Sequence, residues 1–214
     1  MPKITIENMT ILCEPDEKYI QVDDIKEADT QKVWQQITAQ YPGFTVDFVF
    51  HNTVAPINFL NEIGAKVIDD CIEARLVKKD LIQMPARSTT RIDDSNFDAF
   101  AALHDEKNIE LEMYWTSERL RQNLANWDIF GIFDGDKLTG YSFLRSGWEI
   151  YCAEADSLED KLALISACVY RAFEKNPDVE VLYMIDRNAH LELGAAMHLG
   201  FRRVGYYISY RTTT

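Results

Sequence analysis

Four residues between 114 and 127 could line a site whose aromatic rings bind a positively charged ligand. They are Tyr114, Trp115, Arg119 and Trp127. Aromatic rings attract cations through the negative charge on their faces, and the net charge of −13 would draw a cationic amine toward the chain. The same aromatic residues could instead pack a helix against a sheet, which is their commoner role. The cluster therefore indicates either a site for a small-molecule or peptide amine, or a packing interface.

Groups that could move protons lie further along the chain. Glu149 could accept a proton from an ammonium group, directly or through a water molecule. Its alternative interpretation is a solvent-facing strand residue. Tyr207, with Tyr206 and Tyr210 close by, could supply a proton, although alternating tyrosines in a strand usually serve packing. Glu149 and Tyr207 are the catalytic candidates.

Metal and disulfide chemistry find little support. Of the four histidines, only His190 and His198 share a helical stretch, and they are eight positions apart, too far for both to reach one metal ion. The four cysteines lie in apolar runs without a CxxC pair, which is typical of buried thiols. We therefore expect no metal ion and no structural disulfide.

Several classes of protein are disfavoured by composition and by missing motifs. A net charge of −13 opposes binding to nucleic acids. The sequence has no GxSxG, GxxxxGK[ST] or GxGxxG motif, so hydrolase, nucleotide hydrolase and dehydrogenase functions are unsupported. No apolar run approaches the roughly 18–20 residues that cross a membrane, and the first residues lack a signal-peptide core. We expect a cytoplasmic protein with no nucleic-acid or membrane partner, and a homo-oligomer is left open.

Hydrophobic periodicity predicts strands and helices that alternate along the chain. In the first part we expect strands at 3–13, 18–25, 44–50 and 65–77 and helices at 29–41 and 54–63. In the second part we expect helices at 96–106, from 117, at 158–174 and at 189–199, and strands at 127–133, 138–145, 148–154, 179–185 and 201–212. Helices and antiparallel strands in this order indicate an α+β protein with a mixed α/β sheet.

A boundary and a repeat divide the chain. The polar run at 78–80 and the proline-containing stretch at 83–88 predict two domains, 1–84 and 88–214. Segment 45–75 aligns with 181–211 without a gap, so that Gly64 falls on Gly200 and strand, helix and strand coincide. We interpret the first domain as a smaller α/β half-repeat of the second, with chance similarity as the alternative.

The segment MIDRNAHLELGAAMHLGFRRVGYY at 184–207 places Asn188 after a strand, then a short helix, then Leu-Gly-Phe before the last strands. Earlier, MYWTSERL at 113–120 precedes WDIFGIF and GYSFLR. In these segments and in the order of its elements, the region 88–212 resembles the GNAT superfamily of N-acetyltransferases. The resemblance implies a GNAT-like fold and an enzyme that moves an acetyl group from acetyl-CoA to a primary amine of a small molecule or peptide.

The resemblance also implies where acetyl-CoA would bind. The strands at 148–154 and 179–185 would splay apart, and backbone groups of Cys152, Ala153 and Glu154 would hold the pantetheine arm like an added strand. Asn188 would contact the same arm, and Lys161 could help to neutralise the pyrophosphate. The acceptor would lie near 114–127.

The sequence departs from the GNAT pattern at the pyrophosphate loop. AEADSLEDKLAL at 153–164 contains no glycine, and Asp156, Glu159 and Asp160 stand where small or basic residues are expected. Each carboxylate would repel the pyrophosphate by roughly 1 kcal/mol. Ser157 and Asp160 predict an ordinary helix cap instead, and Ala196 replaces the tyrosine acid of many family members. The second hypothesis is therefore a catalytically inactive GNAT-fold binding or interaction protein.

Overall fold

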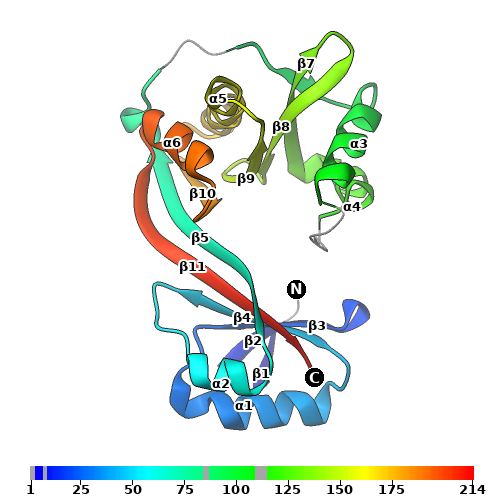
Figure 1. The fold of residues 1–214 in the computed structure, drawn as a ribbon, viewed down its shortest axis with the longest axis vertical. Helices are drawn as coiled ribbons and strands as arrows, with labels where there is room; N and C mark the ends of the chain where they lie inside the picture. The colour runs from blue at the N-terminus through cyan, green and yellow to red at the C-terminus, as the bar shows by residue number, and fades with distance from the viewer. Residues whose placement is uncertain (1–2, 7–8, 84–86, 109–114) are drawn as a thin grey trace. The chain divides into compact units, whose positions relative to one another are not determined.

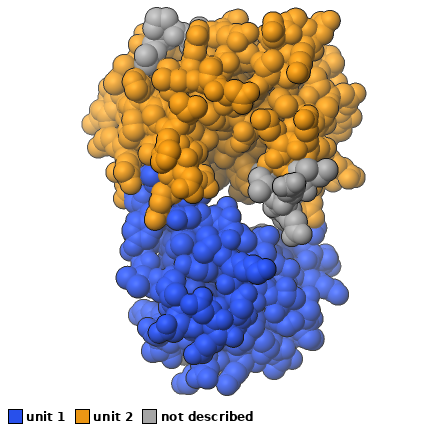
Figure 2. All heavy atoms as spheres, in the orientation of Figure 1, with its two compact units in different colours: residues 1–72, 205–214 blue, residues 73–204 orange. Residues whose placement is uncertain are grey.

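The computed structural model describes residues 3–6, 9–83, 87–108 and 115–214. These residues form two compact units, which are coloured separately in Figure 2. Unit 1 comprises Met1–Ile72 and Gly205–Thr214, and unit 2 comprises Glu73–Val204. The units describe compactness in space, so the division at 84–88, which concerns repeats in the sequence, stays a prediction.

Two long strands belong to both units. They are β5 (Lys66–Val77) and β11 (Arg202–Thr213). The first seven residues of β5 lie in unit 1 and the rest in unit 2, whereas β11 begins in unit 2 and continues into unit 1. Each half of the sequence therefore supplies a strand segment to the unit formed mainly by the other half (Figure 1).

Unit 1 is a sheet covered on one face by helices (Figure 1). Its strands run in the order β1-β2-β3-β4-β11, with β3 and β4 parallel. Its core joins the sheet to Val33 and Ile37 of one helix and to Phe59 and Leu60 of the other. The elements are β1 (Lys3–Ile6), β2 (Met9–Glu14), η1 (Pro15–Glu17), β3 (Tyr19–Asp23), α1 (Glu27–Gln40), β4 (Thr45–His51) and α2 (Ile57–Glu62).

The segment 3–13, expected as one extended strand, is instead the antiparallel pair of β1 and β2. Lys3 lies opposite Leu12 and Ile6 opposite Met9. Apolar and polar residues alternate through both strands. This alternation with a period of two looks the same in the sequence whether the chain runs straight on or turns back to form a second strand. The expectation of a single strand was wrong for this reason.

Unit 2 has three layers (Figure 1). Its strand order is β5-β10-β9-β8-β7-β6. Helices α5 and α6 pack on one face through a core that includes Ile165, Val169 and Ala196, and α3 and α4 pack on the other through Phe100 and Leu120. The elements are η2 (Lys78–Asp80), β6 (Thr90–Ile92), α3 (Phe97–Asn108), α4 (Ser117–Gln122), η3 (Leu124–Asn126), β7 (Trp127–Asp134), β8 (Lys137–Arg145), β9 (Glu149–Glu154), α5 (Leu158–Lys175), β10 (Glu180–Asp186) and α6 (His190–His198).

None of the helices in the described part of the chain is long and apolar enough to cross a membrane.

Candidate active site

The parallel strands β9 and β10 separate soon after they meet. They pair only at Glu149 with Leu182 and at Ile150 with Tyr183. On its other side β9 pairs with β8, where a shift in register leaves Tyr151 as an extra residue, a β-bulge. Bulges bend a strand and interrupt its pairing. Because this bulge directly follows Ile150, it explains why β9 and β10 diverge there, as the resemblance led us to expect.

Side chains from α5 and α6 fill part of this opening. Lys161 Nζ donates a hydrogen bond to the Ala153 carbonyl oxygen at 2.6 Å. The Ala153 N–H donates to the carboxylate of Glu192, and the Tyr183 hydroxyl donates to the same carboxylate. We call Lys161 and Glu192 the plug pair. Both backbone groups of Ala153, which were expected to hold an extended ligand, are bonded to the plug pair.

The plug pair is buried and fully engaged. Lys161 is 8% exposed and Glu192 9%, and Lys161 Nζ lies 3.7 Å from Glu192 Oε2. Burial raises the pKa of Glu192, while the hydrogen bond from Tyr183 and the charge of Lys161 act in the opposite direction. Buried charges are stable only when they are paired and hydrogen-bonded, so each member of the pair depends on the other.

The neighbouring cysteine is also engaged. The Cys152 carbonyl oxygen accepts a hydrogen bond from Ser142 Oγ at 2.6 Å. Burial raises the pKa of the Cys152 thiol well above its usual range, so the thiolate is scarce at neutral pH. Glu154 ends β9 opposite Tyr141 of β8. The structure therefore brings Cys152, Ala153, Glu154 and Lys161 together, and their role in holding acetyl-CoA stays a prediction.

A surface pocket of about 350 Å³ lies beside the plug pair. Its lining combines the plug pair with the β10–α6 connection and the first turn of α6. Asn188 is exposed there, its backbone N–H bonded to Asp186 Oδ1 at 2.7 Å. The lining residues are Lys161, Asn188, Ala189, His190, Leu191 and Glu192.

The start of α5 is capped by the side chain of the residue just before it, Ser157. Ser157 Oγ accepts a hydrogen bond from the Asp160 N–H at 3.0 Å, which is the cap that the sequence predicts. Asp160 forms an ion pair with Arg87 at 3.1 Å, and Asp156 is 97% exposed with Lys107 3.9 Å away. A cap of this kind and its acidic first turn stabilise the helix, but they disfavour a second anion at the same place.

On the other face of the sheet, three residues from three strands form a row. Trp127 of β7 lies opposite Arg145 of β8, and Arg145 lies opposite Glu149 of β9. Paired residues point to the same face of a sheet. The guanidinium of Arg145 lies 5.4 Å from the ring centroid of Trp115 and 5.8 Å from that of Trp127. The aromatic cluster therefore holds a cation of the protein itself.

Of the four residues predicted to line the acceptor site, the structure brings Trp115 and Trp127 together. Trp115 and Trp127 meet edge to face with centroids 5.0 Å apart. Arg119 lies in α4 and Tyr114 falls outside the described residues. Sequence reasoning missed Arg145, because only the strand register brings it beside the two indoles.

The two catalytic candidates lie in different units. Glu149, in unit 2, has a side chain only 17% exposed and lies 3.7 Å from Arg145. Burial raises its pKa, and Arg145 opposes this rise. The ring of Tyr207, in unit 1, contacts the ring of His51 with centroids 5.2 Å apart, and burial raises the pKa of Tyr207 too. Tyr210 packs in the core of unit 1. The roles of Glu149 and Tyr207 stay predictions.

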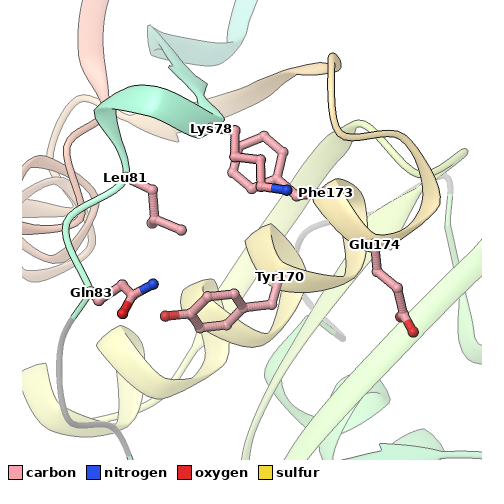
Figure 3. A pocket seen from close by; sticks show the side chains of 6 residues that line it. All are labelled: Lys78, Leu81, Gln83, Tyr170, Phe173 and Glu174. Atoms are coloured by element: carbon pink, nitrogen blue, oxygen red, sulfur yellow. The ribbon is translucent and has the colours of Figure 1, made fainter.

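A second pocket, of about 270 Å³, lies between the η2 segment and the C-terminal half of α5. Figure 3 shows the side chains that line it, which are Lys78, Leu81, Gln83, Tyr170, Phe173 and Glu174. None of the predicted site residues is among them. In the described part of the chain, no three His, Cys, Asp or Glu side chains gather to hold a metal ion.

Comparison with known proteins identifies the fold. No family model and no curated protein matches the sequence. A GCN5-related N-acetyltransferase from Sphaerobacter thermophilus superposes with a TM-score of 0.61 at 12% identity, over 95% of this chain and 75% of that one. The chain has the GNAT fold. A tandem GNAT protein from the clavulanic acid biosynthesis pathway superposes with a TM-score of 0.58 at 12% identity, covering 96% of this chain and 78% of that one.

A conserved protein of unknown function from Staphylococcus epidermidis is also similar, with a TM-score of 0.66 at 10% identity over 99% of this chain and 93% of that one. Within the GNAT fold, the residues present fit an acetyl donor only in part. The opening between β9 and β10 and the pocket beside it suit the extended pantetheine arm of an acetyl donor. The plug pair suits this arm poorly because it already occupies the backbone groups of Ala153. The acidic start of α5 suits the donor's pyrophosphate poorly because both are negatively charged.

Proposed function

We propose that unit 2 is an N-acyltransferase domain that transfers an acetyl group from acetyl-CoA to a primary amine of a small molecule or peptide. The observation that carries this proposal is the pairing of β9 and β10, which stops after Ile150 and Tyr183. A parallel sheet with no such function would gain by continuing its hydrogen bonds along both strands. A cytoplasmic location stays part of the proposal.

Residues of this chain would contribute to the reaction in two ways. Glu149 would take a proton from the ammonium group of the acceptor, so that the neutral nitrogen can attack the thioester carbonyl carbon. The new C–N bond forms as the C–S bond breaks, and the thiolate takes up the second proton of the amine. A pKa raised by burial suits Glu149 to this task, because it makes the carboxylate a stronger base.

Donor binding is the direct test. We expect acetyl-CoA to bind weakly to the unaltered protein, because the plug pair must leave Ala153 first. Lys161→Ala should raise the affinity at least about tenfold, whereas Lys137→Ala, at an exposed lysine where β8 begins, should change it little. Calorimetric titration measures both, with thermal melting to check that each variant is folded.

A second candidate function is a binding protein without catalysis. The plug pair favours it, because Lys161 and Glu192 already occupy both backbone groups of Ala153. If neither the unaltered protein nor Lys161→Ala binds acetyl-CoA at millimolar concentration, the second function replaces the first. If Lys161→Ala binds acetyl-CoA and the unaltered protein does not, the proposed acyl transfer is retained, and the plug pair is what limits donor binding.

Replacing Glu149 with glutamine should lower the rate of acyl transfer about 100-fold, because the amide cannot accept the proton. In the unaltered protein the rate should rise with pH through a range above the ordinary glutamate pKa of 4.5, since the deprotonated form is the active one and its pKa is raised. This rise should vanish in Glu149→Gln. Release of free thiol with a panel of primary amines gives both profiles, and an unchanged rate would remove Glu149 from the mechanism.

A further inference from the structure

Arg145 stands at the centre of a row of side chains that starts beside the opening of the sheet. Glu149 pairs with Leu182, one residue before the last pair that joins β9 and β10, which is Ile150 with Tyr183. Arg145 is next in the row, and Trp127 follows it. A molecule whose amine reached Glu149 would therefore place its neighbouring atoms over Arg145.

Two hydrogen-bond donors in this row, the Arg145 guanidinium and the Trp127 indole N–H, have room for a further acceptor. Among the described residues, the polar partner of the Arg145 guanidinium is Glu149 at 3.7 Å, which exceeds the length of a hydrogen bond. The indole N–H of Trp127 is buried and has no hydrogen-bond partner in the described part of the chain, although the residue is only 4% exposed. Buried donors are nearly always bonded, so this cluster lacks an acceptor.

We propose that the acceptor of unit 2 is an amino acid or a similar molecule with a carboxylate close to its primary amine. This inference rests on the proposed acyl transfer and names its substrate class. The carboxylate binds Arg145 over the indoles of Trp115 and Trp127, and the ammonium group binds Glu149. A guanidinium and a carboxylate side by side are complementary to a molecule that carries both opposite charges.

Other ligand classes fit the row less well. A simple monoamine carries only a cation, and Arg145 already occupies the aromatic faces that would attract it. A phosphate would bring a double negative charge next to Glu149. A carboxylate offers two oxygens to the planar fork of Arg145, and its neighbouring ammonium group neutralises the effect of Glu149.

Calorimetric titrations of the full chain without acetyl-CoA test the proposal. The probes are the standard amino acids that carry a primary amine and matched amines that lack the carboxylate, such as phenethylamine for L-phenylalanine and cadaverine for L-lysine. We expect at least one amino acid to bind about tenfold or more tightly than its matched amine, because the amine loses the contact with Arg145.

Variants assign the difference to Arg145. Arg145→Gln should weaken amino-acid binding about tenfold and leave amine binding unchanged, and Arg145→Lys, which keeps the charge without the fork, should lie between. Arg121→Gln is the control, because Arg121 also stacks on an aromatic ring, that of Phe97 at 4.5 Å, but lies in α4. If Arg145→Gln does not fold, Arg145→Lys carries the test.

The proposal is overturned if no amino acid binds at millimolar concentration, if the matched amines bind equally well, or if neither Arg145 variant changes the affinity. Acyl transfer fails separately. Amino acids that bind through Arg145 without any transfer of acetyl groups would uphold the carboxylate site and remove the proposed reaction, whereas rapid acetylation of amines without a carboxylate would do the reverse.

Discussion

Glu192→Ala is expected to lower the free energy of unfolding by about 3–5 kcal/mol, the cost of leaving a buried charge without its partner. The ammonium group of Lys161 would keep its bond to the Ala153 carbonyl but lose the carboxylate beside it. The Ala153 N–H and the Tyr183 hydroxyl would lose their acceptor as well. Urea unfolding followed by circular dichroism measures the loss.

Glu192→Gln is the matched control. The amide oxygen can still accept hydrogen bonds from Ala153 and Tyr183, so the loss should be smaller, about 1–2 kcal/mol. The pKa of Glu192 is raised in the folded chain, which therefore holds its proton more tightly than the unfolded chain. Stability from this group is complete below the ordinary pKa of 4.5 and declines as the pH rises. A loss below about 1 kcal/mol for Glu192→Ala would show that the plug pair is unimportant to the fold.

Gly200→Ala should lower the free energy of unfolding by about 3 kcal/mol or more, the range of severe backbone and packing defects. Gly200 has a φ of +97°, and an added Cβ would lie 2.1 Å from the Asp80 carbonyl oxygen. The segment after Asp80 is fixed by the hydrogen bond from the Ile82 N–H to the Leu199 oxygen at 3.0 Å. Backbone atoms cannot move aside as a flexible side chain would. Thermal and urea unfolding measure the effect.

Gly64→Ala separates strain from collision. Gly64 occupies the corresponding position in the aligned segment, has a φ of +68°, and has no atom within 4 Å of an added Cβ. The Gly64→Ala substitution should lower the free energy of unfolding by only about 1–2 kcal/mol, the cost of placing alanine in a left-handed backbone conformation. If the two variants lost equal stability, the close approach of Asp80 to Gly200 would not matter.

Most elements could be predicted because their burial follows simple periods. The α5 helix was expected at 158–174 and spans Leu158–Lys175, with Ile165 and Val169 buried on the expected face. The separation of β9 and β10 was also expected, and the structure has it. Common descent of segments 45–75 and 181–211 stays a prediction, although both contain a strand, a helix and a strand.

Register was harder to predict than the elements themselves. Asp134 pairs with Lys137 at the turn between β7 and β8, and counting outward from there would place Trp127 opposite Leu144. A shift between Ile132 and Phe133 places Trp127 opposite Arg145 instead. One residue of slip exchanges the faces of a strand, so Arg145 could not be assigned to the aromatic cluster from the sequence.

The plug pair was missed for a different reason. The resemblance implied that Lys161 could help to neutralise a pyrophosphate, and a lysine in the first turns of a helix usually points to solvent. Its partners Ala153 and Glu192 lie on other elements, β9 and α6. No local pattern connects these three residues, and their contact follows from tertiary packing alone.

The passage of β11 into unit 1 has a consequence for how the polypeptide is made. Residues 205–214 pair with β4, for example Arg211 with Asp47. A ribosome that has completed the first half of the protein has not yet synthesised this strand, so the nascent unit 1 must wait with an unpaired edge. Such long-range pairing slows folding and exposes strand edges to aggregation. Chaperone dependence during translation should accordingly concentrate on the earliest-made residues.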